Sequence, residues 1–396
     1  MTRQGVVGVL AGVIAVIVGR VFGVIELYVI GAAFVVAAVF AVAYVLLRHP
    51  RLRVTRWVHP SVLVAGDTGR VDVHIAHDGA LPTPRVELTD AVHRSNAPDQ
   101  RARLAVGPIR RRAAASAGYQ LPTTTRGVIT VGPLVIETRD PLGMARRRSE
   151  VAGSDDLIVA PRSFAVSMPR LGHGVLGNHL MQRSQRLGPG EFHSLREYVQ
   201  GDEPRSIHWK ASARSDSLIV KQHTTEGLRR VTVVLDADRR GYLDSAGFER
   251  AVTVAASVVN SADRAALTTR FVTAPDVDLR GPEVAVHTLR LLARLETTVS
   301  PMRALDRDPG EGLGLLVVIS GSERGPAWRA AHAATDPTLT VIPVFTEEPP
   351  HVALGVAART DDEFINRWER LAGGERLDIR ASLADVESAT RVGATS

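Results

Sequence analysis

Two long apolar runs open the chain and predict a pair of membrane-spanning helices. Residues 5–19 carry no charged or strongly polar side chain, and residues 27–47 are apolar except for the hydroxyls of Tyr28 and Tyr44. A helix needs about 20 predominantly apolar residues to cross a bilayer, which the second run provides alone and the first provides with its neighbours. We therefore predict membrane-spanning helices at about residues 5–25 and 27–47.

Basic residues beside the two runs predict the orientation of the pair. Arg20 lies between the runs and Arg3 precedes them, whereas four arginines follow them closely, namely Arg48, Arg51, Arg53 and Arg56. Because cytoplasmic flanks are enriched in lysine and arginine, we expect both termini in the cytoplasm and the chain in the cell (inner) membrane. The alternatives are a cleaved signal peptide and a buried soluble hairpin. The longer second run argues against the former, and the lack of a polar stripe argues against the latter.

A different pattern follows in residues 51–160, where apolar and polar side chains alternate over short stretches between turn signals. Such alternation predicts strands with one buried face. The stretches are Ser61–Val64, Arg70–Ala76, Arg85–Leu88, Leu104–Val106, Gly118–Leu121, Val128–Val131 and Leu134–Glu137. Short strands at this spacing are typical of an all-β, immunoglobulin-like antiparallel sandwich, preceded by the membrane anchor of residues 1–50.

Two motifs of this region carry a resemblance to a known family. Thr125–Leu134 and the following Thr138–Gly143 resemble the membrane-proximal domain of bacterial proteins of the Domain of Unknown Function 58 family. Gly127 and Gly132 are expected to punctuate the two strands of a hairpin. Asp140 begins a turn in which the next residue, a proline, fixes φ. None of these residues is expected to be catalytic.

Residues 161–228 form a charged segment that is expected to connect the β domain to the rest of the chain. The spacing of its apolar, proline and glycine positions predicts a short helix at Ser194–Val199, a second helix from Pro204 to Ser212 and a strand at Leu218–Gln222.

The densest part of this segment, residues 187–222, is similar to the defining segment of the same family. One departure is His208, where many relatives carry aspartate before the tryptophan. The candidate partner-binding or structural charge network consists of Glu191, Arg196, Tyr198, Asp202, Arg205, Trp209, Arg214 and Lys221.

Two interpretations of these residues remain open. In the first, which we favour, opposite charges pair and hold the segment against its neighbours, with Trp209 as an apolar anchor. In the second, the basic residues bind an acidic or phosphorylated substrate and Glu191 or Asp202 acts as a base. The chain contains no nucleophile elbow and no Walker-type phosphate loop, and His193, His208 and His223 of this segment lie fifteen residues apart, which is not a metal-binding spacing. We therefore assign no catalytic residue, no cofactor and no small-molecule substrate.

Strands and helices alternate in residues 229–396. Strands are predicted at Val231–Leu235, Leu267–Val272, Leu315–Ile319 and Leu339–Val344, and helices at Ala246–Ala262, Pro282–Leu295, Trp328–Ala334 and Asp362–Leu371. This alternation is typical of an α/β domain with a mostly parallel, helix-covered sheet.

The first of these strands ends in a turn with two aspartates, and the domain resembles a von Willebrand factor A-like fold, which members of the family usually carry. The metal site of that fold uses an aspartate and two serines to bind Mg²⁺. Here Asp236 matches the aspartate, but Asp238 and Arg240 occupy the serine positions, and the later loop Ser320–Ser322 lacks a further aspartate. We therefore expect weak or absent Mg²⁺ binding at a degenerate ion site.

Composition narrows the classes of function. The chain contains no cysteine, which excludes disulfides, thiolate metal ligands and cysteine nucleophiles. Of its net charge of +6, the whole excess lies in residues 48–160, which hold 17 basic and 11 acidic residues. Since these arginines are not interleaved with base-stacking aromatics, we expect contact with an anionic lipid surface and no nucleic-acid partner.

These observations predict a membrane-anchored, cytoplasm-facing scaffold or interaction protein. The family resemblance implies a MoxR-type AAA+ ATPase as partner, in assembly or cell-envelope processes. The alternative is a membrane-bound enzyme that acts on a phosphorylated or acidic substrate through residues 187–222.

Overall fold

A computed structural model of the chain describes residues 1–47, 52–79, 82–95, 97–186, 192–199, 207–214, 217–223, 230–300, 302, 314–334 and 339–373. The chain divides into two compact units, Met1–Ala160 and Pro161–Ser396. The first unit contains the two apolar runs and the β-rich region, and the second contains the charged segment and the region of alternating strands and helices.

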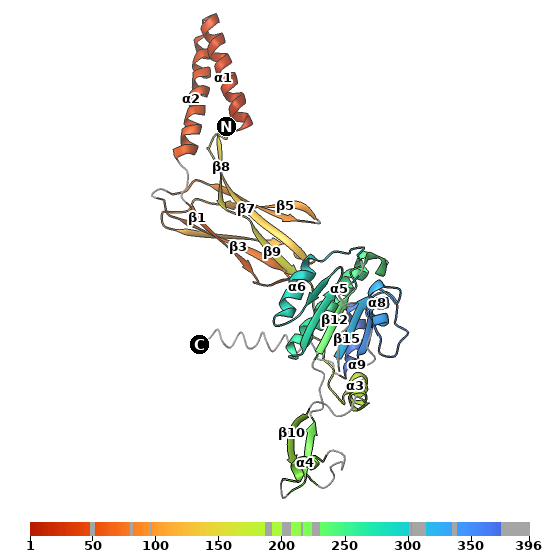
Figure 1. Cartoon of the computed structure of the whole chain (residues 1–396). Helices are drawn as coiled ribbons and strands as arrows, with labels where there is room; N and C mark the ends of the chain where they lie inside the picture. Colours follow the sequence, from red (N-terminus) through yellow and green to blue (C-terminus); the bar gives the residue numbers. More distant parts are fainter. Residues whose placement is uncertain are drawn as a thin grey trace. The chain divides into compact units, whose positions relative to one another are not determined.

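The apolar runs form two helices that pack side by side, α1 (Arg3–Phe22) and α2 (Ile25–Leu47) (Figure 1). The side chain of Thr2 caps the start of α1, and Gly23 ends it with a φ of 70°, a conformation that glycine adopts without steric penalty. At a rise of 1.5 Å per residue, a helix of 20 residues is about 30 Å long. Both helices are therefore long and apolar enough to span a membrane, as predicted.

Small residues at a spacing of seven line the contact between the two helices. Gly12 and Gly19 of α1 and Gly31 of α2 are buried in this contact, whereas the buried Gly5 lies against Met144. A Cβ atom added to Gly12 would lie 3.0 Å from the carbonyl oxygen of Gly31, and one added to Gly31 would lie 2.6 Å from that of Gly12. The two backbones therefore touch directly, as in membrane helix pairs built on small residues.

The rest of the first unit is built of strands. Their bounds are β1 (Leu52–His59), β2 (Leu63–Val64), β3 (Gly69–His77), β4 (Val86–Arg94), β5 (Ala97–Val106), β6 (Ala114–Leu121), β7 (Gly127–Arg139), β8 (Arg146–Ala152) and β9 (Asp155–Ala160). Among the described residues, β1-β3-β6 form one sheet and β2-β9-β7-β4-β5 a second, with β8 paired to β7. Alternate side chains of both sheets, such as Val73, Leu88 and Ile136, are buried in one shared core. The result is a two-sheet β domain.

One predicted feature of this domain is wrong. Residues 127–139 form the single strand β7 and not the two arms of a hairpin. Gly132 has a φ of 110°, and the register between β7 and β4 shifts close by, between Asp90 and Val92. Gly132 and Pro133 therefore mark a bulge, where glycine and proline are tolerated within a strand. The strand bends there without reversing.

The turn between β7 and β8 contacts the start of α1 and the end of α2. The backbone N–H of Thr2 donates to the carbonyl oxygen of Met144 (3.0 Å), and its hydroxyl donates to that of Gly143 (2.7 Å). The carboxylate of Asp140 shapes the turn, because it accepts hydrogen bonds from two backbone N–H groups within it. The same turn packs against the last turns of α2, so the helices and the β domain share one continuous contact.

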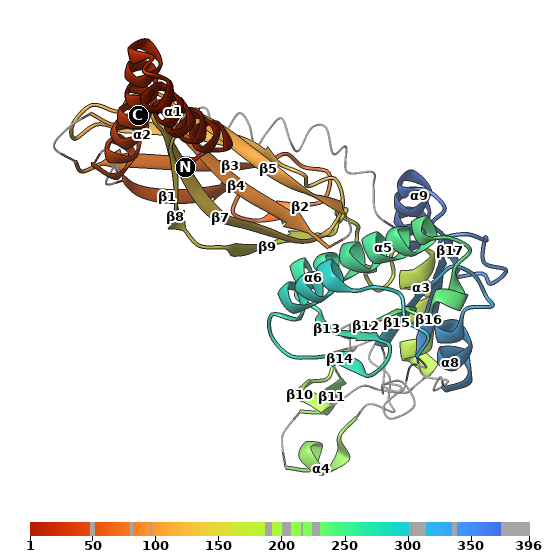
Figure 2. The same ribbon diagram turned by 90° about the horizontal axis from the view of Figure 1, so that it is seen from above.

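The second unit is built around a mostly parallel sheet (Figure 2). Its strands are β12 (Arg230–Leu235), β13 (Thr268–Thr273), β14 (Val277–Leu279), β15 (Gly314–Ser320), β16 (Thr340–Phe345) and β17 (Val356–Ala357), and its main helices are α3 (Gly174–Arg186), α5 (Ser245–Arg264), α6 (Val284–Arg294), α8 (Pro326–Ala334) and α9 (Asp361–Ala372). The described strands lie in the order β14-β13-β12-β15-β16-β17, and among them β14 pairs antiparallel. The predicted alternation of strands and helices is confirmed.

Helices cover both faces of this sheet. Alternate side chains of the strands, such as Val233 and Val317, pack with α3, α5, α6 and α9 on one face. The intervening side chains, such as Val234 and Val318, pack with α8 on the other face. Burial on both faces explains why these strands read as continuous apolar runs in the sequence.

Candidate functional site

The charged segment contains a small hairpin of two strands. β10 (Phe192–Glu197) pairs antiparallel with β11 (Ile219–His223), and α4 (Trp209–Ser212) lies between them in the sequence. The prediction of a helix at Ser194–Val199 is therefore wrong, because pairing with β11 overrides the helical propensity of the leucine, arginine and glutamate in this stretch. The predicted strand at Leu218–Gln222 is confirmed.

The structure describes the predicted charge network only in part. Glu191, Asp202 and Arg205 lie outside the described residues, as do the side chains of Arg196 and Lys221. The backbones of these last two residues lie in β10 and β11, where Arg196 pairs with Val220 and Lys221 pairs with Leu195. The network, and the alternative in which Glu191 or Asp202 acts as a base, therefore stay predictions.

Other predicted residues have defined places around β11. The N–H of Tyr198 donates to the carbonyl oxygen of Leu218 (2.8 Å), just beyond the paired part of β10. Trp209 is the first residue of α4, and Arg214 follows the end of that helix and is exposed. The structure thus brings Tyr198 close to the start of β11, next to the segment that carries Trp209.

His208 and Ser212 tie α4 to β11, a role that the sequence did not reveal. The Nδ1 atom of His208 accepts a hydrogen bond from the N–H of Ala211 (3.0 Å) and so caps the helix. The N–H of His208 donates to the carbonyl oxygen of Ile219 (2.7 Å), and the hydroxyl of Ser212 accepts from the N–H of Ile219 (2.8 Å). His208 is thus a structural cap, and because histidine is not among the residues favoured at N-caps, no local signal in the sequence indicates this role.

Three large apolar side chains are exposed at one end of this hairpin. Trp209 is 66% exposed, Val199 63% and Leu218 44%. Val199 follows Tyr198, which bonds to Leu218, and Trp209 follows His208, which bonds to Ile219. We call Val199, Trp209 and Leu218 the apolar tip. Exposed apolar groups gathered in one place are typical of surfaces that contact a partner.

A second candidate lies at the carboxyl ends of the parallel strands, where ligands bind in sheets of this kind. Asp236 follows β12 and is 1% exposed. Its Oδ1 accepts a hydrogen bond from the N–H of Asp238 (3.0 Å). Its Oδ2 accepts from the hydroxyl of Ser320 (2.8 Å) and the N–H of Ala327 (3.2 Å). Asp236 thus joins the ends of β12 and β15 to the first turn of α8.

Two glycines lie so close to this carboxylate that a side chain at either position would collide with it. A Cβ atom on Gly241 or on Gly325 would lie 2.8 Å from the Oδ2 atom of Asp236. Burial raises the pKa of Asp236, and its hydrogen bonds offset only part of that effect. Beside it, Arg240 donates to Asp238 through Nη2 (2.6 Å), and these hydrogen bonds lower the pKa of Asp238.

These contacts do not fit an octahedral Mg²⁺ site. Magnesium needs several oxygen ligands at about 2.0–2.1 Å, whereas both oxygens of Asp236 accept hydrogen bonds from protein donors and a guanidinium lies against Asp238. In the part of the chain that the structure describes, no three carboxylate or imidazole side chains gather into a group that could hold a metal. The expectation of weak or absent Mg²⁺ binding stays a prediction.

We expect Asp236→Ala to lower the free energy of unfolding of the second unit by about 2–4 kcal/mol, because buried N–H and O–H donors lose their acceptor. Thermal unfolding with and without MgCl₂ measures this loss. Asp244→Ala is the control, since Asp244 only caps the start of α5 and its loss costs about 1 kcal/mol. A rise in Tm on adding Mg²⁺ that is present in the wild type and absent in Asp236→Ala would contradict the structural role.

Comparison with known proteins identifies the family. Residues 194–303 match the family described as "Protein of unknown function DUF58", a region that begins in β10 and includes Trp209, Asp236 and Asp238. "Uncharacterized protein YeaD" of Bacillus subtilis (strain 168) is 26% identical to this chain over 147 residues, which are 36% of this chain and 35% of that protein. Residues 194–303 are therefore similar to the DUF58 family, the family that the charged segment resembles. The match covers about a third of this curated relative's length.

Solved structures resemble the chain only remotely. The CARDB domain of the PF1109 protein from Pyrococcus furiosus has 13% identity and a TM-score of 0.19, with 28% of this chain and 88% of that chain covered. The putative ApaA protein from Bordetella pertussis has 13% identity and a TM-score of 0.22, with 28% and 94% covered. Likenesses with TM-scores this low do not define a shared fold.

Proposed function

We propose that this DUF58 family protein is a membrane-anchored scaffold that works by contact with a protein partner, a MoxR-type AAA+ ATPase. In this proposal α1 and α2 cross the inner membrane, and both termini and both units lie in the cytoplasm. The β domain belongs to the immunoglobulin-like class and the second unit to the von Willebrand factor A-like class. The parallel, helix-covered sheet and the two-sheet β domain support these assignments.

The orientation rests on the basic residues at the two ends of the helix pair. Arg3 lies at the end of the pair that adjoins the β domain, and Arg53 and Arg56 lie in β1 of that domain, whereas Arg20 lies near the turn at the opposite end. The positive-inside rule then places the β domain on the cytoplasmic side.

The apolar tip is the observation that carries the contact function. Its three side chains are exposed within a hairpin that is otherwise rich in polar residues, and the family match begins in this hairpin. Tryptophan is enriched among the residues that dominate binding energy at interfaces. An exposed tryptophan in the family's own segment therefore favours a docking surface.

Retention of the partner on solubilised membranes tests this function. We expect Trp209→Ala to reduce the amount of an epitope-tagged MoxR-type ATPase that copurifies with the chain by about tenfold or more, because a central tryptophan contact is lost. Trp57→Ala is the matched control, since Trp57 is also exposed (58%) but lies in the β domain. Equal retention by wild type and Trp209→Ala, with both variants folded, would show that the apolar tip is not the docking surface.

A further inference from the structure

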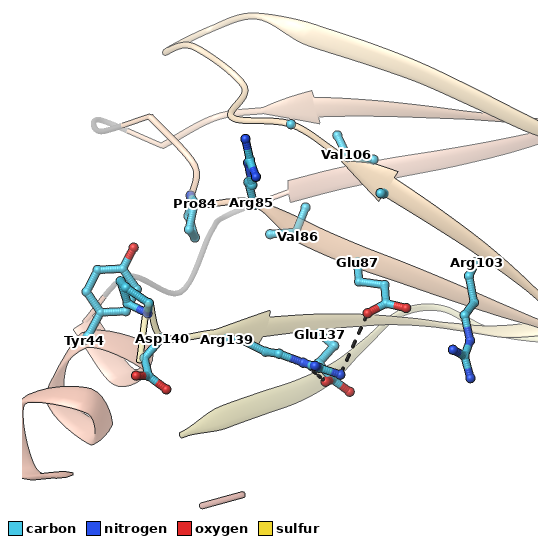
Figure 3. A pocket seen from close by; sticks show the side chains of 13 residues that line it. Tyr44, Pro84, Arg85, Val86, Glu87, Arg103, Val106, Glu137, Arg139 and Asp140 are labelled. Carbon is cyan, nitrogen blue, oxygen red and sulfur yellow. Dashed lines mark hydrogen bonds and ion pairs between the residues drawn. The ribbon is translucent and has the colours of Figure 1, made fainter. Parts of the chain in front are cut away.

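A cavity of about 830 Å³ lies on the first unit, beside the last turn of α2 (Figure 3). Its lining includes Tyr44, Pro84, Arg85, Glu87, Arg103 and Arg139. Figure 3 shows Tyr44 and Pro84 toward one end of the cavity and Arg103 at the other. All of these residues belong to the unit that contains the helix pair.

The cavity is built on the outward face of the sheet that contains β4, β5 and β7. Val86 and Leu88 of β4 are buried in the core, so Glu87 between them points to the opposite face. Glu87 pairs in register with Glu137 of β7, and Arg103 pairs with Thr89 on the neighbouring strand. A sheet face of this kind is normally open to solvent, but here α2 and the residues before β4 border one end and make it concave.

The position of Tyr44 sets the depth of the cavity relative to a bilayer. Tyr44 lies in the last turn of α2, which ends at Leu47, and tyrosine is enriched at membrane–water interfaces. Thr2, at the start of α1, bonds to the turn between β7 and β8, and the same turn packs against α2. The start of α1 and the end of α2 therefore lie at the same level. The polar headgroups extend several ångströms beyond the hydrocarbon core. If α1 and α2 cross the membrane, as proposed above, the cavity opens at headgroup level.

Most charged side chains of the cavity are paired with one another, and the guanidinium groups of Arg85 and Arg103 are the exceptions among the described lining residues. Arg139 donates to Glu137 (2.6 Å) and lies 3.9 Å from Glu87, while Arg148 donates to the other oxygen of Glu137. Burial acts to raise the pKa of Glu137, but the hydrogen bonds from these two arginines outweigh it and lower the pKa. Glu137 is therefore an ionised, fully engaged carboxylate.

The remaining acidic group of the lining is engaged as well. Asp140 accepts hydrogen bonds from backbone N–H groups of its own turn. By contrast, Arg85 and Arg103 are exposed, and no hydrogen bond or ion pair joins either side chain to another of the described residues. Guanidinium groups recognise phosphate oxygens through paired, charge-assisted hydrogen bonds.

We propose that this cavity binds the headgroup of an anionic phospholipid from the adjoining leaflet. Tyr44 borders the glycerol end, Arg85 beside it donates to the phosphodiester, and Arg103 at the far end of the cavity donates to the polar headgroup atoms beyond the phosphate. The inference rests on the membrane anchoring proposed above. It assigns the positive charge of residues 48–160, which hold 17 basic and 11 acidic residues, to a specific site in addition to a diffuse attraction.

Native mass spectrometry of the full-length protein in detergent tests the site with three probes: short-chain phosphatidylglycerol, short-chain phosphatidylcholine and soluble glycerophosphoglycerol. We expect the affinity for phosphatidylglycerol to fall by about tenfold or more in Arg85→Gln/Arg103→Gln, since each charge-assisted hydrogen bond lost corresponds to roughly that factor. Arg101→Gln/Arg111→Gln removes the same charge from exposed residues outside the cavity, and its affinity should stay at the wild-type value.

A second pair of variants blocks the cavity without changing charge. Gly107 lines the cavity, and an added Cβ atom there would meet no neighbour within 4 Å. Gly107→Phe should therefore weaken phosphatidylglycerol binding while the fold is kept. Gly153 has equally open surroundings but does not line the cavity, so Gly153→Phe should bind as the wild type does.

Three results would overturn the site. Equal losses in the cavity variants and their controls would show a diffuse charge effect, and equal affinity for phosphatidylcholine would remove the requirement for an anionic headgroup. Equal affinity for glycerophosphoglycerol would show a site for soluble phosphodiesters.

Extraction of membranes with alkaline carbonate distinguishes failure of the membrane anchoring from failure of the lipid site. Release of the wild-type chain would overturn the anchoring and the site together, whereas retention combined with any of the three results overturns the site alone.

Discussion

Replacing Arg56 by alanine is expected to lower the free energy of unfolding of the first unit by about 3–5 kcal/mol, because the change leaves an uncompensated buried charge. The side chain of Arg56 is 6% exposed and that of Asp90 is 0% exposed, and Nη1 of Arg56 lies 3.2 Å from Oδ1 of Asp90. The hydroxyl of Tyr119 donates to the same carboxylate (2.7 Å). Since Arg56 and Tyr119 come from β1 and β6 and Asp90 from β4, this cluster joins the two sheets.

Hydrogen exchange of the β3 and β4 backbone measures this effect in the full-length protein, because it reports on the first unit separately. Arg53→Ala is the matched control. Arg53 lies on the same strand and pairs with Asp78, but the two side chains are 77% and 56% exposed, so its loss should cost less than about 1 kcal/mol. Similar protection losses in both variants would show that the buried pair contributes nothing specific.

The effect of Arg56→Ala should depend on pH. Burial raises the pKa of Asp90, while the Tyr119 hydroxyl and the Arg56 guanidinium lower it by less. A carboxyl group with a raised pKa in the folded state costs stability in its ionised form, and this cost grows as the pH rises through that pKa. Removing Arg56 raises the pKa further, so the difference between variant and wild type should be larger at about pH 7 than at about pH 4.

Trp368→Ala is expected to destabilise the second unit by about 3–5 kcal/mol, the usual cost of truncating a buried large aromatic side chain. Trp368 lies on α9, is 1% exposed and packs into the core between the helices and the sheet. Its Nε1 atom donates to the carbonyl oxygen of Ser167 (2.8 Å), and the neighbouring Glu369 accepts from the N–H of Ser167 (2.7 Å). The substitution therefore leaves a cavity and also releases the chain that precedes α3.

Chemical denaturation of the full-length protein in detergent, with exchange of the β12 and β15 amides as readout, measures the loss. Trp209→Ala provides the control within the same unit, because Trp209 is 66% exposed and its removal creates no cavity. If the two tryptophan variants were equally stable, α9 would not belong to the cooperative core of the second unit.

Burial explains which elements the sequence could predict. Nearly every side chain is buried in strands β12 and β15, which therefore appear in the sequence as continuous apolar runs. One face is buried in helices α5 and α9, which therefore show apolar residues at helical spacing. Strand β8 alternates only between exposed and half-buried positions and begins with three arginines, so it carries no hydrophobic signal. The sequence pattern predicts two strands in place of β7, because glycine and proline indicate turns more often than bulges.

Long-range contacts explain why the candidate sites could be predicted only in part. The sequence placed Asp236 at the end of a strand, but its partners Ser320 and Ala327 lie 84 and 91 residues further along the chain. Likewise, Ser194–Val199 has helical propensity, and only the pairing with β11 makes it a strand. The cavity beside Tyr44 combines helix α2 with strands from three separate stretches of the chain, and no local motif marks it.

The route of the chain through β7 and β9 has a mechanical consequence. Strand β7 ends at Arg139, next to the turn that bonds to the start of α1. The other end of β7 pairs with β9. The last residue of β9, Ala160, is followed by the second unit. A pull on Ala160 along the strand axis, resisted at Arg139, slides two antiparallel strands past each other in shear. The ladder bonds from Val131 to Gly127 then carry the tension together and do not open one at a time. A force applied to the second unit would therefore reach α1 and α2 before the pairing of β7 with β9 breaks.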